Sequence, residues 1–349
     1  MISTRDRFDG KPLRCGVVGV GRMGQHHARV YANMPGCHLV GVVDASKDRR
    51  EEMADKFETT SFSSIDELLN AGVDAVSVAV PTIHHWTAAQ PLLQAGVACL
   101  IEKPLAADVE AARALKDLAE QTGSVLMVGH IERFNPVMRA MQKAALMGQP
   151  IVPRFMQVVR VSPMTFRSVD VGVVLDMMIH DIDVVLMLMG GREPDYIRAA
   201  GVAVVTEHED ICNAWLEFQT DNGRCVADIT SSRLALKTER VTRITGENAY
   251  IKIDYAAKKG NVIRRTANEI QMREVREQIR LGSDLTSLKW GQLVNIEELE
   301  VDDAEPIVAE IEAFLKAVRT GERPMIDAEA GFANVRTAER IVEAIKKGM

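Results

Sequence analysis

The sequence lacks the features that mark several classes of protein. Its five cysteines are scattered without a Cys-x-x-Cys pair, which argues against a disulfide framework or a zinc site and predicts reduced thiols in a cytoplasmic protein. It has no long basic run and a formal net charge of −7, so we do not expect nucleic acid as a partner. No apolar run reaches membrane-spanning length, and the polar amino terminus carries no apolar signal core. These absences predict a soluble cytoplasmic protein without a membrane segment.

The first third of the chain alternates strand and helix patterns. A length of 349 residues exceeds one average domain, and 47% hydrophobic residues suffice for real cores. Short, nearly continuous apolar runs are typical of strands buried on both faces of a parallel sheet. They occur at 14–20, 38–44, 74–80, 97–103 and 124–130, with helical patterns such as 64–72 and 108–123 between them. The pattern predicts an α/β, doubly wound parallel sheet.

After residue 150 the chain is rich in strand patterns broken by turn signals. Within 211–218, Cys212, Ala214, Leu216 and Phe218 alternate with polar neighbours, which predicts an α+β domain with an open antiparallel sheet. The apolar segment 171–190 is expected to be a helix that covers one face of this sheet, and two final helices are expected to pack back on the first domain. We therefore predict a dinucleotide-binding domain over 1–131, a substrate and oligomerisation domain over 132–305, and carboxyl-terminal helices over 306–349.

A glycine-rich loop follows the first predicted strand and opens a helix. Gly19 permits a tight turn, Gly21 lets a pyrophosphate approach the backbone, and Gly24 allows close helix–strand packing. The intervening Arg22 and Met23 are then expected beside the dinucleotide. An ordinary glycine turn is the alternative. The second strand ends in Asp44, twenty residues past Gly24, where ribose hydroxyls are expected, and this spacing favours the dinucleotide site.

Asp44 also bears on the choice of cofactor. A carboxylate accepts hydrogen bonds from a free 2′-hydroxyl and repels a 2′-phosphate, which favours NAD over NADP. Three cations follow closely, and we assign them to the solvated face of the next helix: Lys47, Arg49 and Arg50.

The motif Glu102-Lys103-Pro104 ends another predicted strand. Because ligands of open α/β sheets bind at the carboxyl ends of the strands, Lys103 is expected to face the cofactor crevice. A surface lysine at a strand end is the alternative. Pro104 makes the preceding peptide bond a candidate for the cis form.

The stretch LDMMIHDID, residues 175–183, places ionisable groups in a very apolar region. At helical spacing Asp176, His180 and Asp183 share one face. Burying such groups costs several kcal/mol, on the order of 2–7 even for neutral polar groups, unless they are paired or used. A satisfied core pair is the alternative for Asp176 and His180, and Asp183 is assigned to structure. No third ligand accompanies them, so no metal site is predicted.

Taken together, these motifs resemble one family. Gly-Val-Gly-Arg-Met-Gly (19–24), Asp44, AVPTIHH (79–85), the Glu-Lys-Pro motif, VGHIERFNP (128–136) and the Asp-x-x-x-His of 176–180 are similar in order and spacing to the Gfo/Idh/MocA oxidoreductases, from about residue 12 onward. The resemblance implies a Rossmann domain joined to an open-faced sheet domain.

The resemblance also implies roles for particular residues. Lys103 would be an active-site residue and His180 the catalytic histidine, while Pro81, His85 and Glu102 would lie near the cofactor. We expect His180 to take the proton of a substrate hydroxyl while hydride passes to NAD, and Asp176 to hold its imidazole. Lys103 would polarise the alkoxide or relay the proton. The choice between Lys103 and His180 as the base stays open.

Two segments narrow the expected substrate. Residues 130–136 and 170–183 are similar to the subgroup of UDP-N-acetylglucosamine 3-dehydrogenases and related nucleotide-sugar enzymes. Arg133 and Asn135 are then expected near the substrate, and Arg167 near the UDP phosphates, with surface salt bridges as the alternative for the arginines.

Other functions stay open. The chain could oxidise an inositol or a free sugar, or it could be a non-catalytic dinucleotide-binding sensor, against which the intact Lys103, Asp176 and His180 argue. An exposed sheet face predicts a homodimer or homotetramer.

Overall fold

The computed structural model describes residues 8–146, 151–166, 169–267, 269–282, 291 and 293–348. The chain forms two compact units, each made of separate segments. Unit 1 comprises Met1–Phe134, Ile182–Glu193 and Ala304–Glu343, and unit 2 comprises Asn135–Asp181, Pro194–Asp303 and Ala344–Met349. Across the described ranges, none of the helices has the length and apolar character that crossing a membrane demands.

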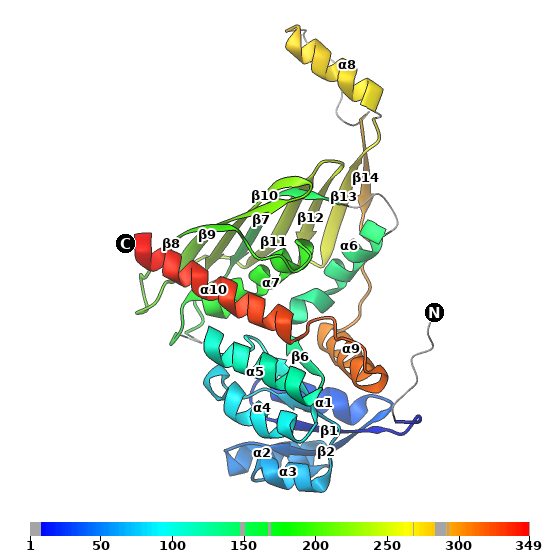
Figure 1. The fold of residues 1–349 in the computed structure, drawn as a ribbon, viewed down its shortest axis with the longest axis vertical. Coiled ribbons are helices and arrows are strands. Elements are labelled where there is room, and N and C mark those ends of the chain that lie inside the picture. Colours follow the sequence, from blue (N-terminus) through cyan, green and yellow to red (C-terminus); the bar gives the residue numbers. More distant parts are fainter. Residues whose placement is uncertain are drawn as a thin grey trace. The chain divides into compact units, whose positions relative to one another are not determined.

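Unit 1 is built on a parallel sheet (Figure 1). Its six strands follow the order β3-β2-β1-β4-β5-β6, which is the doubly wound order of dinucleotide-binding folds. The strands are β1 (Leu13–Val18), β2 (Cys37–Val43), β3 (Thr60–Phe62), β4 (Ala75–Val78), β5 (Ala98–Glu102) and β6 (Leu126–Gly129). The predicted parallel sheet is thus confirmed, and β3 is an additional strand that the apolar pattern did not reveal.

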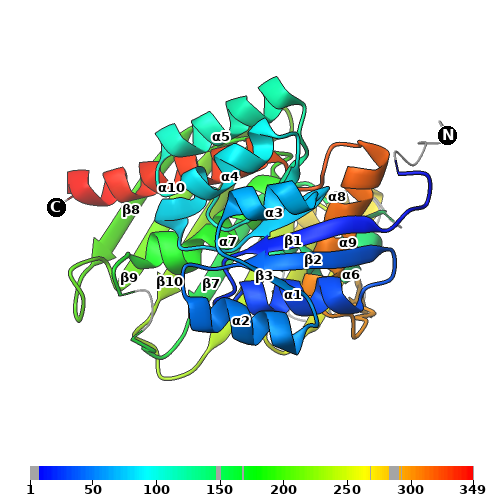
Figure 2. The same cartoon turned by 90° about the horizontal axis from the view of Figure 1, so that it is seen from below.

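Helices cover both faces of this sheet. Figure 2 shows α1 (Gly24–Asn33) and α2 (Lys47–Lys56) on one face and α3 (Ile65–Ala71), α4 (His85–Gln94) and α5 (Val109–Thr122) on the other. The local chemistry that predicted α5 is present. Asp108 caps its first turn by accepting a hydrogen bond from the amide of Ala111 at 2.7 Å, and Gly123 ends it with φ +67°.

Helices from the end of the chain complete the core of unit 1. In α9 (Pro306–Thr320), Ile311 and Phe314 are fully buried in one cluster with Leu100 of β5. The last helix is α10 (Ala328–Gly348), whose residue Phe332 joins the same cluster. The hydrophobic effect therefore recruits residues more than 200 positions downstream of β5 into this core.

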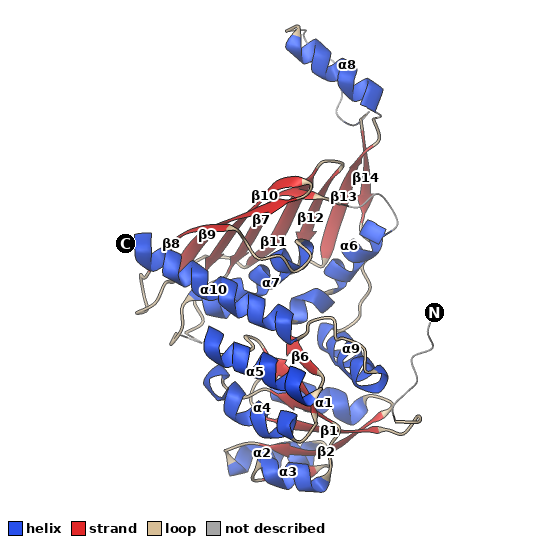
Figure 3. Cartoon of the chain, viewed as in Figure 1, coloured by secondary structure: helices blue, strands red, loops and turns tan. Residues whose placement is uncertain are grey.

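Unit 2 is built on a larger sheet (Figure 3). Its eight strands follow the order β14-β13-β12-β11-β7-β10-β9-β8. They are β7 (Pro153–Val161), β8 (Tyr196–Val202), β9 (Ile211–Thr220), β10 (Gly223–Ser232), β11 (Glu239–Gly246), β12 (Ala249–Asp254), β13 (Lys259–Arg265) and β14 (Val294–Glu298). The sheet is mostly antiparallel, which confirms the expected fold class, and β7 and β10 form a parallel pair within it. A parallel pair needs a long connection, and residues 162–222 supply it.

Burial alternates along β9 as predicted. Cys212, Ala214, Leu216 and Phe218 are fully buried, whereas Asn213 is exposed. The inner face of the sheet therefore packs as a core. Helix α6 (Pro136–Leu146) packs on β12 and β13, and α8 (Glu269–Arg280) precedes β14.

The segment predicted as one helix over 171–190 has two parts. It opens with a π-helical turn, η3 (Val174–Met178), in which the amide of Ile179 bonds the carbonyl of Val174, and continues as α7 (Ile179–Leu188). The π turn was missed because it changes backbone hydrogen bonding without changing the residue pattern.

Candidate functional site

The glycine-rich loop between β1 and α1 forms a tight turn with one open position. Gly19 has φ +85°, and a Cβ added at Gly24 would lie 1.7 Å from the carbonyl oxygen of Gly19. A Cβ at Gly21 would meet nothing within 4 Å. The loop therefore packs closely at both ends and leaves space over Gly21, which fits a pyrophosphate held at the amino terminus of α1. Arg22 is exposed and Met23 half-buried beside that space.

Asp44 follows β2 and joins this loop. Its Oδ2 accepts a hydrogen bond from the amide of Val20 at 2.9 Å, and its Oδ1 accepts one from the amide of Ser46 at 2.9 Å. Arg49 Nη1 lies 3.3 Å from Oδ1, and Arg50 Nη1 donates to the Asp44 carbonyl at 3.3 Å. Lys47 and Arg49 are exposed, as expected for the solvated face of α2, while Arg49 and the half-buried Arg50 also contact Asp44.

The Glu102-Lys103-Pro104 turn lies at the carboxyl end of β5. Glu102 Oε2 accepts a hydrogen bond from the Lys103 amide at 3.2 Å, and Oε1 lies 2.9 Å from His27 Nε2. The peptide bond between Lys103 and Pro104 is cis. Lys103 is half-buried, so it is not a freely solvated surface lysine.

His85 holds the other side of the turn. Its buried ring places Nδ1 2.9 Å from the carbonyl oxygen of Pro104, and Nε2 lies 3.1 Å from that of Val80. Burial lowers the pKa of His85, although these carbonyls oppose the shift. The ring therefore joins the loops after β4 and β5, next to the exposed Pro81. Contact between Pro81, His85 or Glu102 and a cofactor stays a prediction.

The residues after β6 carry a buried ion pair. Arg133 in η2 (Ile131–Phe134) donates from Nε and Nη2 to Asp183 at 2.8 and 2.6 Å, and both side chains are buried. This pair agrees with the structural assignment of Asp183. The contacts observed for Arg133 are with protein groups, and its substrate role stays a prediction. Asn135 begins unit 2, where its Oδ1 accepts a hydrogen bond from the amide of Val137 at 3.2 Å.

Asp176 and His180 lie in unit 2, where both are half-buried. Asp176 belongs to the π turn η3 and His180 is the second residue of α7. The next residue, Asp181, is buried and receives two hydrogen bonds from Arg160 of β7, at 2.7 and 2.9 Å. The segment is thus anchored to the sheet of its own unit immediately beside His180.

The predicted site residues are distributed over both units. The glycine loop, Asp44, His85, Glu102 and Lys103 belong to unit 1, whereas Asp176 and His180 belong to unit 2. Their meeting in one site stays a prediction. Arg167 lies outside the described residues. Over the described ranges, no group of three or more His, Cys, Asp or Glu side chains is placed to hold a metal ion.

Sequence reasoning missed His27 and His130. His27 is fully buried in α1, three residues past Gly24, and contacts Glu102. His130 directly follows β6, and burial lowers its pKa. The sequence did contain a signal for each: His130 directly follows an apolar strand pattern, and His27 lies in the helix that follows the glycine loop.

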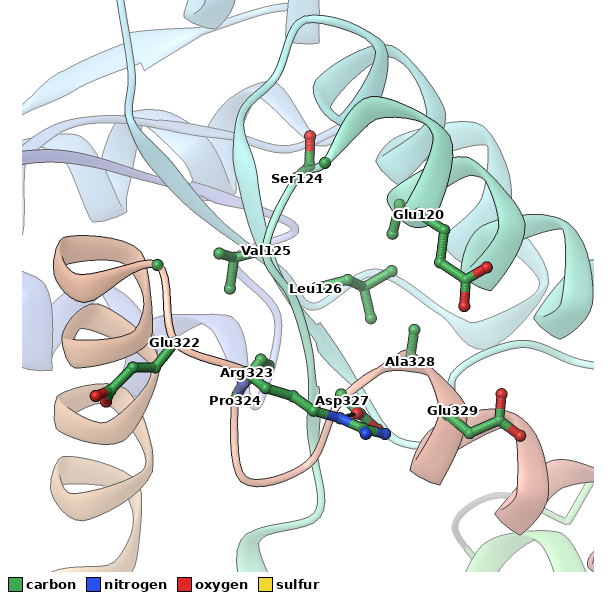
Figure 4. Close-up of a pocket in the computed structure, with 13 residues that line it drawn as sticks. Glu120, Ser124, Val125, Leu126, Glu322, Arg323, Pro324, Asp327, Ala328 and Glu329 are labelled. Atoms are coloured by element: carbon green, nitrogen blue, oxygen red, sulfur yellow. Dashed lines mark hydrogen bonds and ion pairs between the residues drawn. The ribbon is translucent and has the colours of Figure 1, made fainter. Parts of the chain in front are cut away.

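A pocket of about 580 Å³ lies elsewhere on unit 1 (Figure 4). It is lined by the end of α5, the start of β6 and residues 321–324 and 327–329, including the ion pair of Arg323 with Asp327. Because it lies at the amino end of β6, it is at the opposite end of the strand from the carboxyl edge where ligands of such sheets bind. It contains no predicted site residue.

Comparison with known proteins assigns both parts of the chain. Residues 13–130 match the family described as "Oxidoreductase family, NAD-binding Rossmann fold", and residues 165–349 match "Oxidoreductase family, C-terminal alpha/beta domain", both of the Gfo/Idh/MocA type. The chain is 34% identical over 335 residues to UDP-N-acetylglucosamine 3-dehydrogenase of Acidithiobacillus ferrooxidans, covering 96% of this chain and 97% of that protein.

A solved structure and one further relative extend this comparison. A solved structure of UDP-N-acetylglucosamine 3-dehydrogenase GnnA from Acidithiobacillus ferrooxidans superposes with a TM-score of 0.83, at 34% identity, over 96% of this chain and 98% of that one. The scyllo-inositol 2-dehydrogenase (NAD(+)) of Bacillus subtilis is 24% identical, over 97% of this chain and 95% of that protein. The similarity therefore extends to dehydrogenases of both nucleotide sugars and inositols.

Proposed function

Because this chain belongs to the Gfo/Idh/MocA oxidoreductase family, we propose that it oxidises the C3 hydroxyl of UDP-N-acetylglucosamine or a related nucleotide sugar to a ketone, with NAD as the acceptor. The observation that carries the proposal is the 34% identity, over nearly the whole length of both chains, to a UDP-N-acetylglucosamine 3-dehydrogenase. The presence of Lys103, Asp176 and His180 supports catalysis over a sensor role, because a binding module has no need of them.

The proposed cofactor site is the glycine loop with Asp44. Bound there, NAD would supply the hydride acceptor. The amides at the start of α1 would hold its pyrophosphate, and Asp44 would accept hydrogen bonds from the adenosine ribose. We propose NAD over NADP, because a 2′-phosphate would meet the carboxylate of Asp44. Arg49 lies 3.3 Å from that carboxylate, and its positive charge would reduce the preference for NAD by attracting a 2′-phosphate.

The proposed chemistry transfers one proton to the protein. His180 takes the proton from the substrate hydroxyl as the carbon–hydrogen bond at the same carbon gives up its hydride, and the carbon becomes a ketone. Asp176 fixes the tautomer of His180 and stabilises its charged form. Lys103 stabilises the developing alkoxide or relays the proton, and the choice of base between the two residues is open.

The UDP group would provide binding energy remote from the reacting carbon, which holds C3 against the nicotinamide. A diphosphate on a protein of net charge −7 needs a local cation, and we propose Arg167 for this role. Arg133 and Asn135 remain the proposed neighbours of the substrate.

We propose a cytoplasmic homodimer or homotetramer, with the small-molecule substrate as its other partner. The five free cysteines support the cytoplasm. The outer face of the unit 2 sheet supports self-association, because it exposes large apolar side chains at Tyr196, Val202 and Ile211.

The test is a substrate panel. Purified protein and NAD are incubated with UDP-N-acetylglucosamine, other UDP-sugars, free N-acetylglucosamine and inositols, and NADH formation is followed with a ketone trap present. We expect turnover of the UDP-sugar and far poorer turnover of the free sugar. Turnover of inositol with none of the UDP-sugar would place the protein with the inositol dehydrogenases. NAD binding without any turnover would favour a sensor.

A further inference from the structure

A continuous chain of hydrogen bonds leads from the interior of unit 1 to the backbone of Lys103. Tyr31 Oη lies 2.8 Å from Ser77 Oγ, which lies 3.0 Å from His27 Nδ1. His27 Nε2 lies 2.9 Å from Glu102 Oε1, and Glu102 Oε2 accepts the Lys103 amide at 3.2 Å. Residues from α1, β4 and β5 therefore converge on the amide of one residue.

The direction of these bonds follows from the ionised carboxylate at one end. A carboxylate only accepts, so His27 donates from Nε2, and in that tautomer its Nδ1 accepts. Ser77 then donates to His27 and accepts from the Tyr31 hydroxyl. In this arrangement each link of the chain has one donor and one acceptor, which restricts the orientation of each side chain.

The inner end of the chain is closed to any substrate. His27 and Ser77 are fully buried and Tyr31 is 1% exposed. Although Ser77, His27 and Glu102 have the connectivity of a hydrolase triad, the serine hydroxyl lies inside the sheet under Tyr31, so it cannot act as a nucleophile. Only the outer end, at Glu102 and Lys103, lies at the carboxyl edge of the sheet.

Several charged or titratable groups from the surrounding elements act on Glu102. Burial opposes its ionisation, but the hydrogen bond from His27 and the charge of Lys103 outweigh burial and lower its pKa. The other groups within electrostatic reach are His85 of α4, His130 after β6 and Glu310 of α9. Burial and the negative charge of Glu102 raise the pKa of Glu310, so of the two carboxyls Glu102 is the one favoured to carry the negative charge.

We propose that Glu102, His27, Ser77 and Tyr31 form a positioning network that holds the backbone of Lys103 and keeps a negative charge beside its ammonium group. The inference rests on the proposed function, in which Lys103 acts on the substrate hydroxyl. None of the four residues needs to touch the substrate. His85 supports the same turn from the opposite side through the carbonyl of Pro104.

The first experiment replaces His27 with two side chains of similar size. Leu cannot donate a hydrogen bond to Glu102, whereas Gln can. We expect His27→Leu to lower kcat about 10- to 100-fold, the scale of a misplaced catalytic group, with little change in the Kd for NAD. His27→Gln should recover most of the loss. Equal kcat in both variants and the unmodified enzyme would overturn the proposal.

The second experiment separates positioning from general folding. The His27→Leu change is combined with Lys103→Ala. If the network acts through Lys103, the double variant should be no slower than Lys103→Ala alone, because the same interaction cannot be lost twice. Losses that multiply would overturn the proposal.

The third experiment uses pH and stays informative if His27→Leu does not fold. Glu102→Gln removes the negative charge that favours the protonated form of Lys103. The limb of the kcat–pH profile that reports Lys103 should therefore move to lower pH, whether that limb rises or falls. A profile in which neither limb moves would overturn the proposal. Full activity of Lys103→Ala would instead refute the role assigned to Lys103. An inactive Lys103→Ala beside unaffected network variants would refute the positioning network alone.

Discussion

Glu310 in unit 1 and Asp210 in unit 2 are both fully buried carboxyls, and their pKa values move in opposite directions. Burial opposes ionisation of Asp210, but its Oδ2 accepts the amides of Val204, Val205 and Thr206 at 2.8, 2.6 and 3.0 Å, and these bonds lower its pKa. Glu310 has no hydrogen-bond partner among the described residues, and burial raises its pKa. The hydrogen-bond donors around Asp210 favour its ionised form, whereas burial without donors favours the neutral form of Glu310.

The same contrast extends beyond these two carboxyls. In unit 1, the buried groups that lack a hydrogen-bond partner within the described ranges include His130 and Glu310, and both lie within electrostatic reach of Glu102. In unit 2, the carboxylate of Asp210 accepts several backbone hydrogen bonds, and Arg160 and Asp181 form a hydrogen-bonded ion pair. A buried polar group without a hydrogen-bond partner costs stability, whereas a buried group with strong partners stabilises the fold. Each of the following predictions tests one side of this contrast.

The largest effect is expected on turnover. Lys103→Ala and His180→Ala should each lower kcat by about 10²–10⁴, because each removes a positioned acid–base or electrostatic group. The Kd for NAD and the Tm should change little. Lys316→Ala is the matched control, because that side chain is 73% exposed. Near-full kcat in either active-site variant would show that the role assigned to that residue is wrong.

The next effect is on stability in unit 2. Arg160→Met should lower the free energy of unfolding by about 3–5 kcal/mol, because it leaves the buried Asp181 without its counter-charge. Urea unfolding measures the change. The double variant with Asp181→Leu should recover much of it, and Arg280→Met, at a side chain 78% exposed, is the control. A loss under 1 kcal/mol for Arg160→Met would show that the ion pair of Arg160 with Asp181 does not stabilise unit 2.

Asp210→Asn should cost about 1–3 kcal/mol near neutral pH, because the amide group of Asn cannot accept all of the hydrogen bonds that the carboxylate accepts. The lowered pKa makes this contribution pH-dependent with a definite sign. The stability from ionised Asp210 is present above its unfolded pKa of about 3.9 and is lost as pH falls below it. The difference in unfolding free energy should therefore narrow from pH 6 to pH 3, and a constant difference would contradict the assignment.

Asp44 differs from Asp210, because its carboxylate also accepts several hydrogen bonds but is assigned to cofactor binding and not to stability. Asp44→Ala should shrink the ratio of kcat/KM for NAD over NADP by roughly tenfold, which corresponds to about 1.4 kcal/mol. Asp48→Ala, in the first turn of α2, is the control. Equal efficiency with both cofactors in the unmodified enzyme would contradict the predicted preference.

The smallest effect should be a gain. Glu310→Met replaces a buried carboxyl that has no donor with an apolar side chain of similar length, and should stabilise the protein by about 1 kcal/mol at neutral pH. The raised pKa of Glu310 means that its stability is present below the unfolded pKa of about 4.3 and is lost as pH rises. The gain should therefore grow between pH 4 and pH 8, with Glu312→Met at an exposed position as the control. A gain that does not depend on pH would show that Glu310 does not titrate as proposed.

Much of unit 1 could be predicted from the sequence, because strands that are buried on both faces consist of consecutive apolar residues. The glycine loop and Asp44 could be placed for the same reason, since their spacing from those strands is local. Strand β3 escaped notice because its three residues are exposed or half-buried. The reach of Arg49 to Asp44 depends on a side-chain rotamer, which no residue pattern specifies.

The buried ion pairs could not be predicted, because the sequence shows which residues are charged but not which of them are partners. Arg133 and Asp183 are 50 residues apart, and Arg160 and Asp181 are 21 apart, so no helical or strand period connects them. The His27 network likewise joins separate elements. Only the packing of these elements shows that a charge in an apolar segment has a partner, and which partner it is.

The assembly of unit 1 from early and late parts of the chain has a consequence for its synthesis. The strands of its sheet are made first, but Ile307, Ile311 and Phe314, which complete its core, are made after every strand of unit 2. A growing chain therefore carries an unfinished apolar surface until α9 has left the ribosome. Exposed apolar surface and strand edges favour aggregation during that interval. The timing of translation, and the chaperones that attend it, thus bear on how much active protein a cell obtains from this chain.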